Sequence, residues 1–180
     1  CPRHGGANIK VKHMMDELLA NIKDLTDEEE IADYLGKIIT KDAGDGSGLI
    51  YGFGHAIYTL SDPRAKILKK NAKKLSAEKG MTDIYEFYKR VEKLVPSVFE
   101  NVKGSKKVIC ANVDFYSGFV YDMLGIESDL FTPLFAVSRI AGWCAHRIEE
   151  ITYGGRIIRP AYRSMVKPTG YVPLDERTAD

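Results

Sequence analysis

The amino-acid sequence predicts an all-α fold. Three observations carry this prediction: apolar residues recur at helical spacing along most of the chain, start and stop residues flank these stretches, and no stretch keeps the alternation of a sheet strand. The chain also contains no internal repeat. We therefore expect packed helices joined by short loops.

The first two helices are predicted from their apolar faces. Apolar residues three and four positions apart run from Ile9 to Leu25 and predict the first helix. Thr26, with Glu29 three positions later, has the spacing of a capping box and predicts the start of the second helix. The apolar residues of range 31–39 form the buried stripe of this second helix.

A glycine-rich segment separates these helices from the next pair. Five glycines lie between Ala43 and His55, so this backbone can adopt positive φ angles or approach a ligand closely. Asp62 and Pro63 then predict the start of a third helix, which reaches about residue 78 and stops at a glycine. A fourth helix is expected over about 82–94.

The last third of the chain contains two further helices and a tail. The apolar segment 108–113 could be strand-like, and it leads into a helix over 115–124 that a glycine ends. Thr132 and Pro133 begin the last long helix, PLFAVSRIAGWCAHRIEEI. The tail after Gly155 is too rich in proline, glycine and charge to pack as a helix, and an arm on a neighbouring subunit is one use for it.

The composition is that of a soluble globular protein. The chain has 180 residues, of which 44% are hydrophobic and 28% are charged, enough for one domain or parts of two. The net charge of +1 argues against a nucleic-acid-binding protein, because such proteins carry a basic excess. No apolar run reaches the length of a membrane span, and no signal peptide is recognisable. We expect no nucleic acid or membrane partner and a cytosolic or organelle-matrix location.

The cysteines and the first residue add two expectations. Cys1, Cys110 and Cys144 are scattered in apolar surroundings, which predicts buried thiols rather than a disulfide framework. Because the chain begins with a cysteine instead of methionine, we expect it to be a piece of a longer protein.

Two of the four histidines are candidates for chemistry. His4 and His55 are each bracketed by glycine just before an expected helix, where free N–H groups and the helix dipole favour anions and a neutral imidazole. One such histidine alone would be interpreted as a turn residue, but two favour catalysis. His13 is expected to face solvent. Cys144 lies two residues from His146, where the two side chains do not share a helical face, so no metal site is expected there.

Three arginines are candidates for binding an anion. Arg139 stands in the most apolar part of the last helix and needs either a carboxylate ligand or an internal ion pair. Arg64 places a cation in a first helical turn, which the helix dipole disfavours unless an anion is bound. Arg159, in IIRPAY, could be an ordinary surface charge, and the lysine run KILKKNAKKL is typical of a solvated helix face.

The motif NVDFYSG places a carboxylate in the apolar run from Val108 to Leu124. Asp114 has two interpretations that stay open together: it caps the following helix, or it acts as an acid or base. Combined with the histidines and arginines, it forms a set suited to abstracting a proton next to the carbonyl of a polyanionic substrate.

The motifs CPRHGGAN, GFGHAIYTLSDPRA, NVDFYSG, FTPLFAVSRIAGW and RIIRPAY, in this order, resemble those of the citrate synthase family. This resemblance spans residues 4–163. It implies an all-α homodimer of a large and a small domain that condenses acetyl-coenzyme A with oxaloacetate to give citrate and coenzyme A. It implies no metal and no permanently bound cofactor, with the coenzyme A thioester as co-substrate.

The resemblance also implies roles for individual residues. Asp114 would be the base, His4 the donor to the thioester carbonyl, and His55 the donor to the oxaloacetate carbonyl. Arg64 and Arg139 would bind the oxaloacetate carboxylates, with Arg159 supplied from the other subunit. The residues expected to hold coenzyme A are Gly48, Leu49, Ile50, Tyr51, Gly52, Phe53, Gly54, Lys107 and Asn112.

The same resemblance predicts a domain division and a location. Residues 1–8 would form the hinge at the end of the large domain with the active-site histidine, 9–122 the small, coenzyme A-binding domain, and 123–180 the C-terminal part of the large domain with an extended tail. The location would be cytoplasmic, or the mitochondrial matrix in a eukaryote. The fragment alone is expected to be inactive.

Three other functions stay open at this point. A 2-methylcitrate synthase, which uses propionyl-coenzyme A, differs by one methylene in the acyl pocket, worth only about 1–3 kcal/mol. A non-catalytic coenzyme A or carboxylate-binding module would keep the same residues. A nucleotide-phosphate loop at GDGSGLIYGFG is disfavoured, because the preceding strand and the Gly-Lys-Ser/Thr ending are missing.

Overall fold

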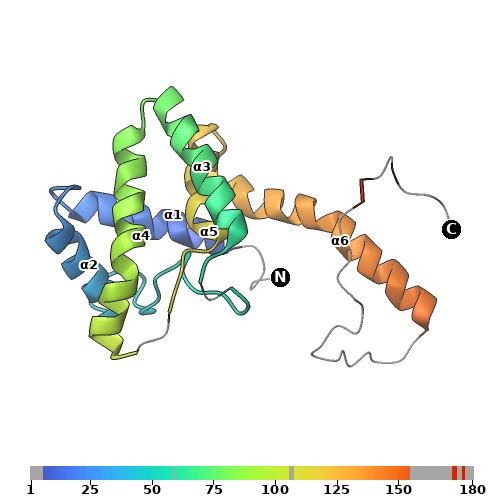
Figure 1. Cartoon of the computed structure of the whole chain (residues 1–180), viewed down its shortest axis with the longest axis horizontal. Coiled ribbons are helices and arrows are strands. Elements are labelled where there is room, and N and C mark those ends of the chain that lie inside the picture. The colour runs from blue at the N-terminus through green and yellow to red at the C-terminus, as the bar shows by residue number, and fades with distance from the viewer. Residues whose placement is uncertain (1–5, 59, 106–107, 155–171, 174–175, 177–180) are drawn as a thin grey trace. The chain divides into compact units, whose positions relative to one another are not determined.

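The computed structural model describes residues 6–58, 60–105, 108–154, 172–173 and 176, and these ranges are all-α, as predicted. Contacts divide the chain into two units, 1–141 and 142–180. The described elements are α1 (Ala7–Asn21), α2 (Glu28–Thr40), α3 (Pro63–Glu78), α4 (Thr82–Lys103), α5 (Val113–Met123), the 3-10 helix η1 (Ser128–Leu130) and α6 (Phe131–Tyr153) (Figure 1).

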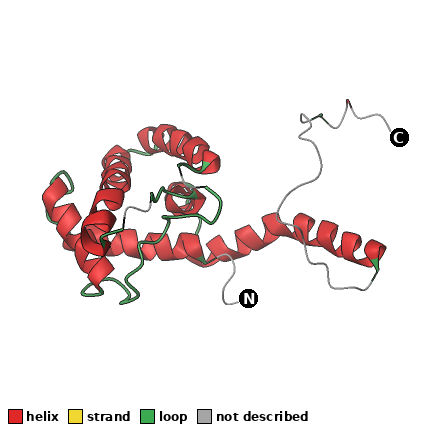
Figure 2. Ribbon diagram, turned by 60° about the horizontal axis from the view of Figure 1, so that its bottom comes forward, coloured by secondary structure: helices red, strands yellow, loops and turns green. Residues whose placement is uncertain are grey.

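Helix α5 is the central helix of the first unit. It packs against both α1 and α3, while α2 packs against α4, and the two views of Figures 1 and 2 agree on this arrangement. The α5 side chains Phe115 and Tyr116 are fully buried, and Phe119 stacks on Tyr88 of α4 with ring centroids 4.8 Å apart. The helix that carries Asp114 is therefore held by apolar contacts on several sides.

Gly118 lets α1 approach α5 closely. A Cβ at this position would lie 3.2 Å from the backbone oxygen of Asn8, closer than side chains normally come. Lys12 of α1 and Asp122 of α5 then form an ion pair with a Nζ–Oδ2 distance of 3.1 Å. Asp122, which lies in the same apolar run as Asp114, thus has an ion-pair partner that it shares with Asp16.

The start of α2 differs from the prediction by one residue. Asp27 is the cap, and its Oδ1 accepts the backbone N–H groups of Glu29 and Glu30 at 2.9 and 3.2 Å. Thr26, predicted to be the cap, donates its hydroxyl to Asp24 at 2.6 Å instead. The predicted capping box is therefore wrong, because the carboxylate one residue later reaches the free N–H groups.

Helix α3 has the predicted start and stop, whereas α4 is longer than predicted. Asp62 caps α3 and Pro63 is its first residue, and Gly80 follows the helix with φ +69°. Helix α4 continues past Pro96 to Lys103 instead of ending near residue 94. Proline removes one helical hydrogen bond there, but the flanking Val95 and Val98 are buried, and this packing keeps the helix continuous.

The strand-like prediction for residues 108–113 is wrong. Among the described residues no strand occurs, and a single antiparallel bridge joins Phe53 to Ala111. Two backbone hydrogen bonds flank this bridge, from Gly54 N to Cys110 O at 2.9 Å and from Asn112 N to Gly52 O at 2.8 Å. The bridge holds the glycine segment against the start of α5.

Helix α6 exposes much of its apolar face. Side chains such as Val137, Ile140, Ile148 and Ile151 are each more than half exposed. Cys144 is also exposed and Cys110 is partly buried, so the prediction of buried thiols fails for Cys144. No helix in the described ranges combines the length and the apolar character needed to cross a membrane.

Candidate active site

His55, Arg64 and Asp114, three of the predicted site residues, lie together beside the start of α5. Asp114 is half-buried in the first turn of this helix. Burial raises the pKa of its carboxyl group, and the nearby Asp62 charge raises it further, while the charges of Arg64 and His55 act in the opposite direction. A carboxyl group in this setting is a better base than one in water.

Asn112, rather than Asp114, caps α5. Its Oδ1 accepts the backbone N–H of Asp114 at 3.0 Å, and its Nδ2 donates to Gly54 O at 3.0 Å. The Asp114 carboxylate itself accepts no hydrogen bond from any described residue. The interpretation of Asp114 as a helix cap is therefore wrong, and its side chain is left available for another role.

His55 lies in a loop, eight residues before α3, so the expected position directly before a helix is wrong. Local backbone groups orient the ring instead: Nδ1 accepts the N–H groups of Ile57 and Tyr58 at 3.0 and 3.1 Å. Because Nδ1 is an acceptor, the neutral ring carries its proton on Nε2. The Nε2 atom lies 3.5 Å from Nη2 of Arg64. Both atoms carry hydrogens to donate, so the two groups can bind the same acceptor, such as a substrate oxygen.

Asp62 holds the Arg64 guanidinium through two parallel bonds. Arg64 Nε donates to Oδ1 at 3.0 Å and Nη2 donates to Oδ2 at 2.8 Å. These bonds hold the pKa of the Asp62 carboxyl below its usual range. The anion that was expected to offset the Arg64 charge is thus supplied by the chain, yet the Arg64 side chain remains 53% exposed and can bind a second anion.

Sequence reasoning missed the second role of Asp62. The sequence predicts only that Asp62 caps α3, and this role is confirmed, since Asp62 accepts the Arg64 N–H at 2.9 Å. Its Oδ2 also accepts the N–H of Val113, 51 residues away, at 3.2 Å. The only signal in the sequence is the order Asp62-Pro63-Arg64, which places a cap carboxylate and a cation two residues apart.

Gly52 brings the glycine segment against the central helix. Its φ is +82°, and a Cβ there would lie 2.9 Å from Phe115 Cβ and 2.9 Å from Val11 Cγ2. Only glycine fits this position, on grounds of both backbone conformation and space. Gly48 and Gly54 also have positive φ, but a Cβ added at Gly54 would have no neighbour within 4 Å.

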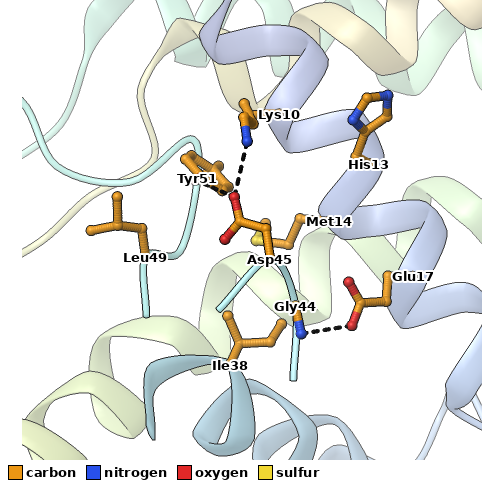
Figure 3. A pocket seen from close by; sticks show the side chains of 9 residues that line it. All are labelled: Lys10, His13, Met14, Glu17, Ile38, Gly44, Asp45, Leu49 and Tyr51. Carbon is orange, nitrogen blue, oxygen red and sulfur yellow. Dashed lines mark hydrogen bonds and ion pairs between the residues drawn. The ribbon is translucent and has the colours of Figure 1, made fainter. Parts of the chain in front are cut away.

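The start of the glycine segment borders a small pocket, with a cavity volume of about 70 Å³, between α1, the end of α2 and the loop that follows it (Figure 3). Asp45 joins two residues that line one wall of the pocket. Its Oδ2 accepts a hydrogen bond from Lys10 Nζ at 2.9 Å and another from the Tyr51 hydroxyl at 2.6 Å. Hydrogen bonds to Ser47, Tyr51 and Lys10 hold the pKa of Asp45 well below its usual range. Leu49 and Tyr51, both expected to contact coenzyme A, line this pocket.

Several predicted residues are not brought into this cluster. Arg139 is exposed on α6, with its guanidinium carbon 5.3 Å from the centre of the Phe135 ring, and no contact joins it to the other described candidates. His4, Lys107 and Arg159 lie outside the described residues. Ile50 and Phe53 are partly buried and pack against the core.

The other two described histidines, His13 and His146, are both exposed. His13 is exposed, as expected, and lines the pocket of Figure 3. His146 Nδ1 lies 3.1 Å from Glu149 Oε2 on the exposed surface of α6. Across the described part of the chain, no group of three or more histidine, cysteine, aspartate or glutamate side chains is arranged to hold a metal ion.

The cluster combines three chemical capacities in one place. Asp114 can accept a proton, His55 can donate a hydrogen bond from Nε2, and Arg64 can bind an anion. Such a set can remove a proton from carbon while a neighbouring carbonyl oxygen becomes negative.

Comparison with known proteins points to one family. The family model described as "Citrate synthase, C-terminal domain" matches residues 1–161. The citrate synthase of Synechocystis sp. is 40% identical over 177 residues, covering 98% of this chain and 40% of the relative. The 2-methylcitrate synthase of Shewanella oneidensis is 37% identical over 178 residues, covering 98% of this chain and 42% of the relative.

A solved structure gives the same result. The ternary complex of carboxymethyl coenzyme A and oxaloacetate with the citrate synthase of Thermoplasma acidophilum matches with a TM-score of 0.66 at 35% identity, covering 98% of this chain and 43% of that chain. The chain thus spans about two fifths of the length of the relatives that it matches.

Proposed function

Because the chain belongs to the citrate synthase family, we propose that the protein containing it condenses acetyl-coenzyme A with oxaloacetate. The products are citrate and free coenzyme A, and the protein is an acyltransferase. The observation that carries the proposal is the cluster of Asp114, His55 and Arg64 beside the start of α5. The relative from Thermoplasma acidophilum, which binds a coenzyme A analogue and oxaloacetate, supports the choice of substrates.

Each residue has a defined part in the reaction. Asp114 removes a proton from the methyl group of the thioester while His4 passes its proton to the thioester oxygen, so that an enol forms. His4 takes this proton back when the enol reacts. The enol carbon attacks the oxaloacetate carbonyl carbon, and that oxygen takes the proton of His55 Nε2. Water then cleaves the thioester, releasing citrate and coenzyme A. Each positioned acid or base contributes about 10²–10⁴ in rate.

The binding residues divide between the two substrates. Arg64 and Arg139, with Arg159 of the second subunit of a homodimer, bind the oxaloacetate carboxylates. Coenzyme A is held by the segment Gly48–Gly54 together with Lys107 and Asn112. The Asn112 side chain also caps α5 and donates a hydrogen bond to Gly54 O, so it fixes the end of the segment to the start of α5. No permanent cofactor or metal takes part.

The domain division and the location are part of the same proposal. Residues 9–122 form the coenzyme A-binding small domain, 1–8 the hinge, and 123–180 the end of the large domain. The exposed apolar side chains of α6 support this division, because a larger body would cover them. The protein acts in the cytoplasm, or in the mitochondrial matrix if the source is a eukaryote.

The test is an assay of coenzyme A release by the full-length protein with acetyl-coenzyme A and oxaloacetate. We expect turnover that requires both substrates, and we expect the 180-residue chain alone to have negligible turnover. Arg64→Gln and Arg139→Gln should weaken oxaloacetate binding far more than coenzyme A binding. A full-length protein that binds both ligands without turnover would instead be a non-catalytic binding module.

A second candidate is a 2-methylcitrate synthase, which the similarity to the Shewanella oneidensis protein favours. The two reactions differ by one methylene of the acyl group, so the pocket discriminates by only about 1–3 kcal/mol. The ratio of kcat/KM for acetyl- and propionyl-coenzyme A decides between them. A ratio above one supports citrate synthase, and a ratio below one supports the alternative.

A further inference from the structure

We propose that Asp62 is a positioning residue, which aligns the substrate-binding Arg64 with the first turn of the helix that carries the base. This inference rests on the proposed function. Asp62 is 1% exposed, and it connects two elements that are 51 residues apart in the chain.

Four hydrogen bonds converge on the two oxygens of Asp62. Its Oδ1 accepts Arg64 N at 2.9 Å and Arg64 Nε at 3.0 Å. Its Oδ2 accepts Arg64 Nη2 at 2.8 Å and Val113 N at 3.2 Å. A carboxylate has acceptor sites for all four donors and carries no donor of its own, so no other side chain of this size satisfies the arrangement.

The bond to Val113 acts directly on the position of Asp114. Val113 and Asp114 are the first two residues of α5, and their N–H groups have no partner within the helix. Asp62 accepts the first N–H and Asn112 accepts the second, at 3.0 Å. The turn that carries the Asp114 carboxylate is therefore fixed from two sides, one of them the residue that also holds Arg64.

Asp62 has an electrostatic effect in the same place. The titratable and charged groups that act electrostatically on Asp114 are Arg64, His55 and Asp62. A cation beside a carboxylate lowers its pKa and weakens it as a base. The negative charge of Asp62 opposes this effect, so that Arg64 can bind a substrate carboxylate next to Asp114 without suppressing the basicity of Asp114.

The experiment compares Asp62→Asn with the parent in the full-length protein. The amide oxygen of this variant can still accept the N–H that caps α3. The amide NH₂ group, however, would face the N–H donors of Arg64 and Val113, so these donors lose their charge-assisted hydrogen bonds. We expect KM for oxaloacetate to rise about 10- to 100-fold, together with a fall in kcat. The acid limb of the kcat/KM profile should move to lower pH, because removing the Asp62 charge lowers the pKa of Asp114.

Asp27→Asn is the matched control, since Asp27 caps α2 through two backbone N–H groups and lies outside the site. It should leave KM, kcat and the pH profile unchanged. If Asp62→Asn does not fold, Asp62→Glu takes its place: it keeps the charge but displaces the carboxylate, so KM for oxaloacetate rises while the acid limb stays.

The outcomes separate this inference from the proposed function. A parent protein without turnover overturns the proposed function. A parent with turnover, combined with an unchanged KM and acid limb in Asp62→Asn, or an unchanged KM in Asp62→Glu, overturns the positioning role alone. The positioning role is supported if Asp62→Asn raises KM for oxaloacetate and moves the acid limb of the kcat/KM profile, while Asp27→Asn changes neither.

Discussion

The backbone N–H of Asp114 donates to Oδ1 of Asn112 at 3.0 Å, so Asn112 caps α5 and the Asp114 side chain does not. Asn112 also donates to Gly54 O at 3.0 Å. We predict that Asn112→Ala lowers the free energy of unfolding by about 1–2 kcal/mol, because a cap and a second hydrogen bond are lost. Asp114→Asn is the control and should cause no such loss. Urea denaturation measures both, and equal losses would contradict the assignment of the cap.

Gly52 and Gly54 form a matched pair of glycines. Both have positive φ, +82° and +81°, but a Cβ at Gly52 would overlap Phe115 and Val11, whereas Gly54 has space. Gly54→Ala should cost about 1–2 kcal/mol of backbone strain. Gly52→Ala should cost about 1–3 kcal/mol more, from overpacking. Comparable losses in chemical denaturation would show that the close approach of the segment to α5 is not the cause.

The Tyr51 hydroxyl connects the glycine segment to the Asp45 wall of the pocket. It donates to Asp45 at 2.6 Å and lies 3.2 Å from Ser47 Oγ. Tyr51→Phe keeps the ring but releases the segment, so KM for acetyl-coenzyme A should rise about 3- to 10-fold while KM for oxaloacetate stays within about twofold. Steady-state kinetics of the full-length protein measure this split. A change in KM for oxaloacetate alone would contradict the proposal that the segment binds coenzyme A.

Asp45 and Asp114 should respond to pH with opposite signs. Hydrogen bonds lower the pKa of Asp45, so its stabilisation is present above the unfolded pKa of about 3.9 and is lost as pH falls through the folded pKa. Burial raises the pKa of Asp114, so its ionisation destabilises the folded state increasingly as pH rises from about 3.9 through the raised value.

At pH 7 and low salt, Asp45→Asn should therefore be less stable than the parent, and Asp114→Asn at least as stable. Both differences should shrink toward zero under acidic conditions, where the parent carboxyl groups are protonated. Thermal melts across the pH range measure them. A stability loss in Asp114→Asn at pH 7 that is absent at low pH would mean that the charged carboxylate has a stabilising partner.

The helices could be predicted from the sequence because their signals are local. The spacing of apolar residues along α1 and the order Asp62-Pro63 at the start of α3 depend only on neighbours in the chain. Errors arose where a neighbour competed: Asp27 replaced Thr26 as a cap, and Asn112 replaced Asp114. In both pairs, each residue has an acceptor side chain suited to a cap, so the backbone geometry decides between them.

The internal connections of the candidate site could not be predicted. The hydrogen bond from Val113 to Asp62 joins residues 51 positions apart, and nothing in either local sequence indicates it. The tautomer of His55 follows from two backbone donors in a loop that has no periodic pattern. The residues of the candidate site could thus be named from motifs, whereas the hydrogen bonds that hold them in place depend on how the chain folds.

The central claim is that Asp114 is the base, and Asp114→Asn in the full-length protein tests it most directly. An amide keeps the size of the side chain but cannot take a proton from the acetyl methyl group. We predict that turnover falls by about 10² or more, while the thermal melt is not lowered and the oxaloacetate affinity stays within about twofold. Turnover within about threefold of the parent would contradict the assignment of Asp114 as the base.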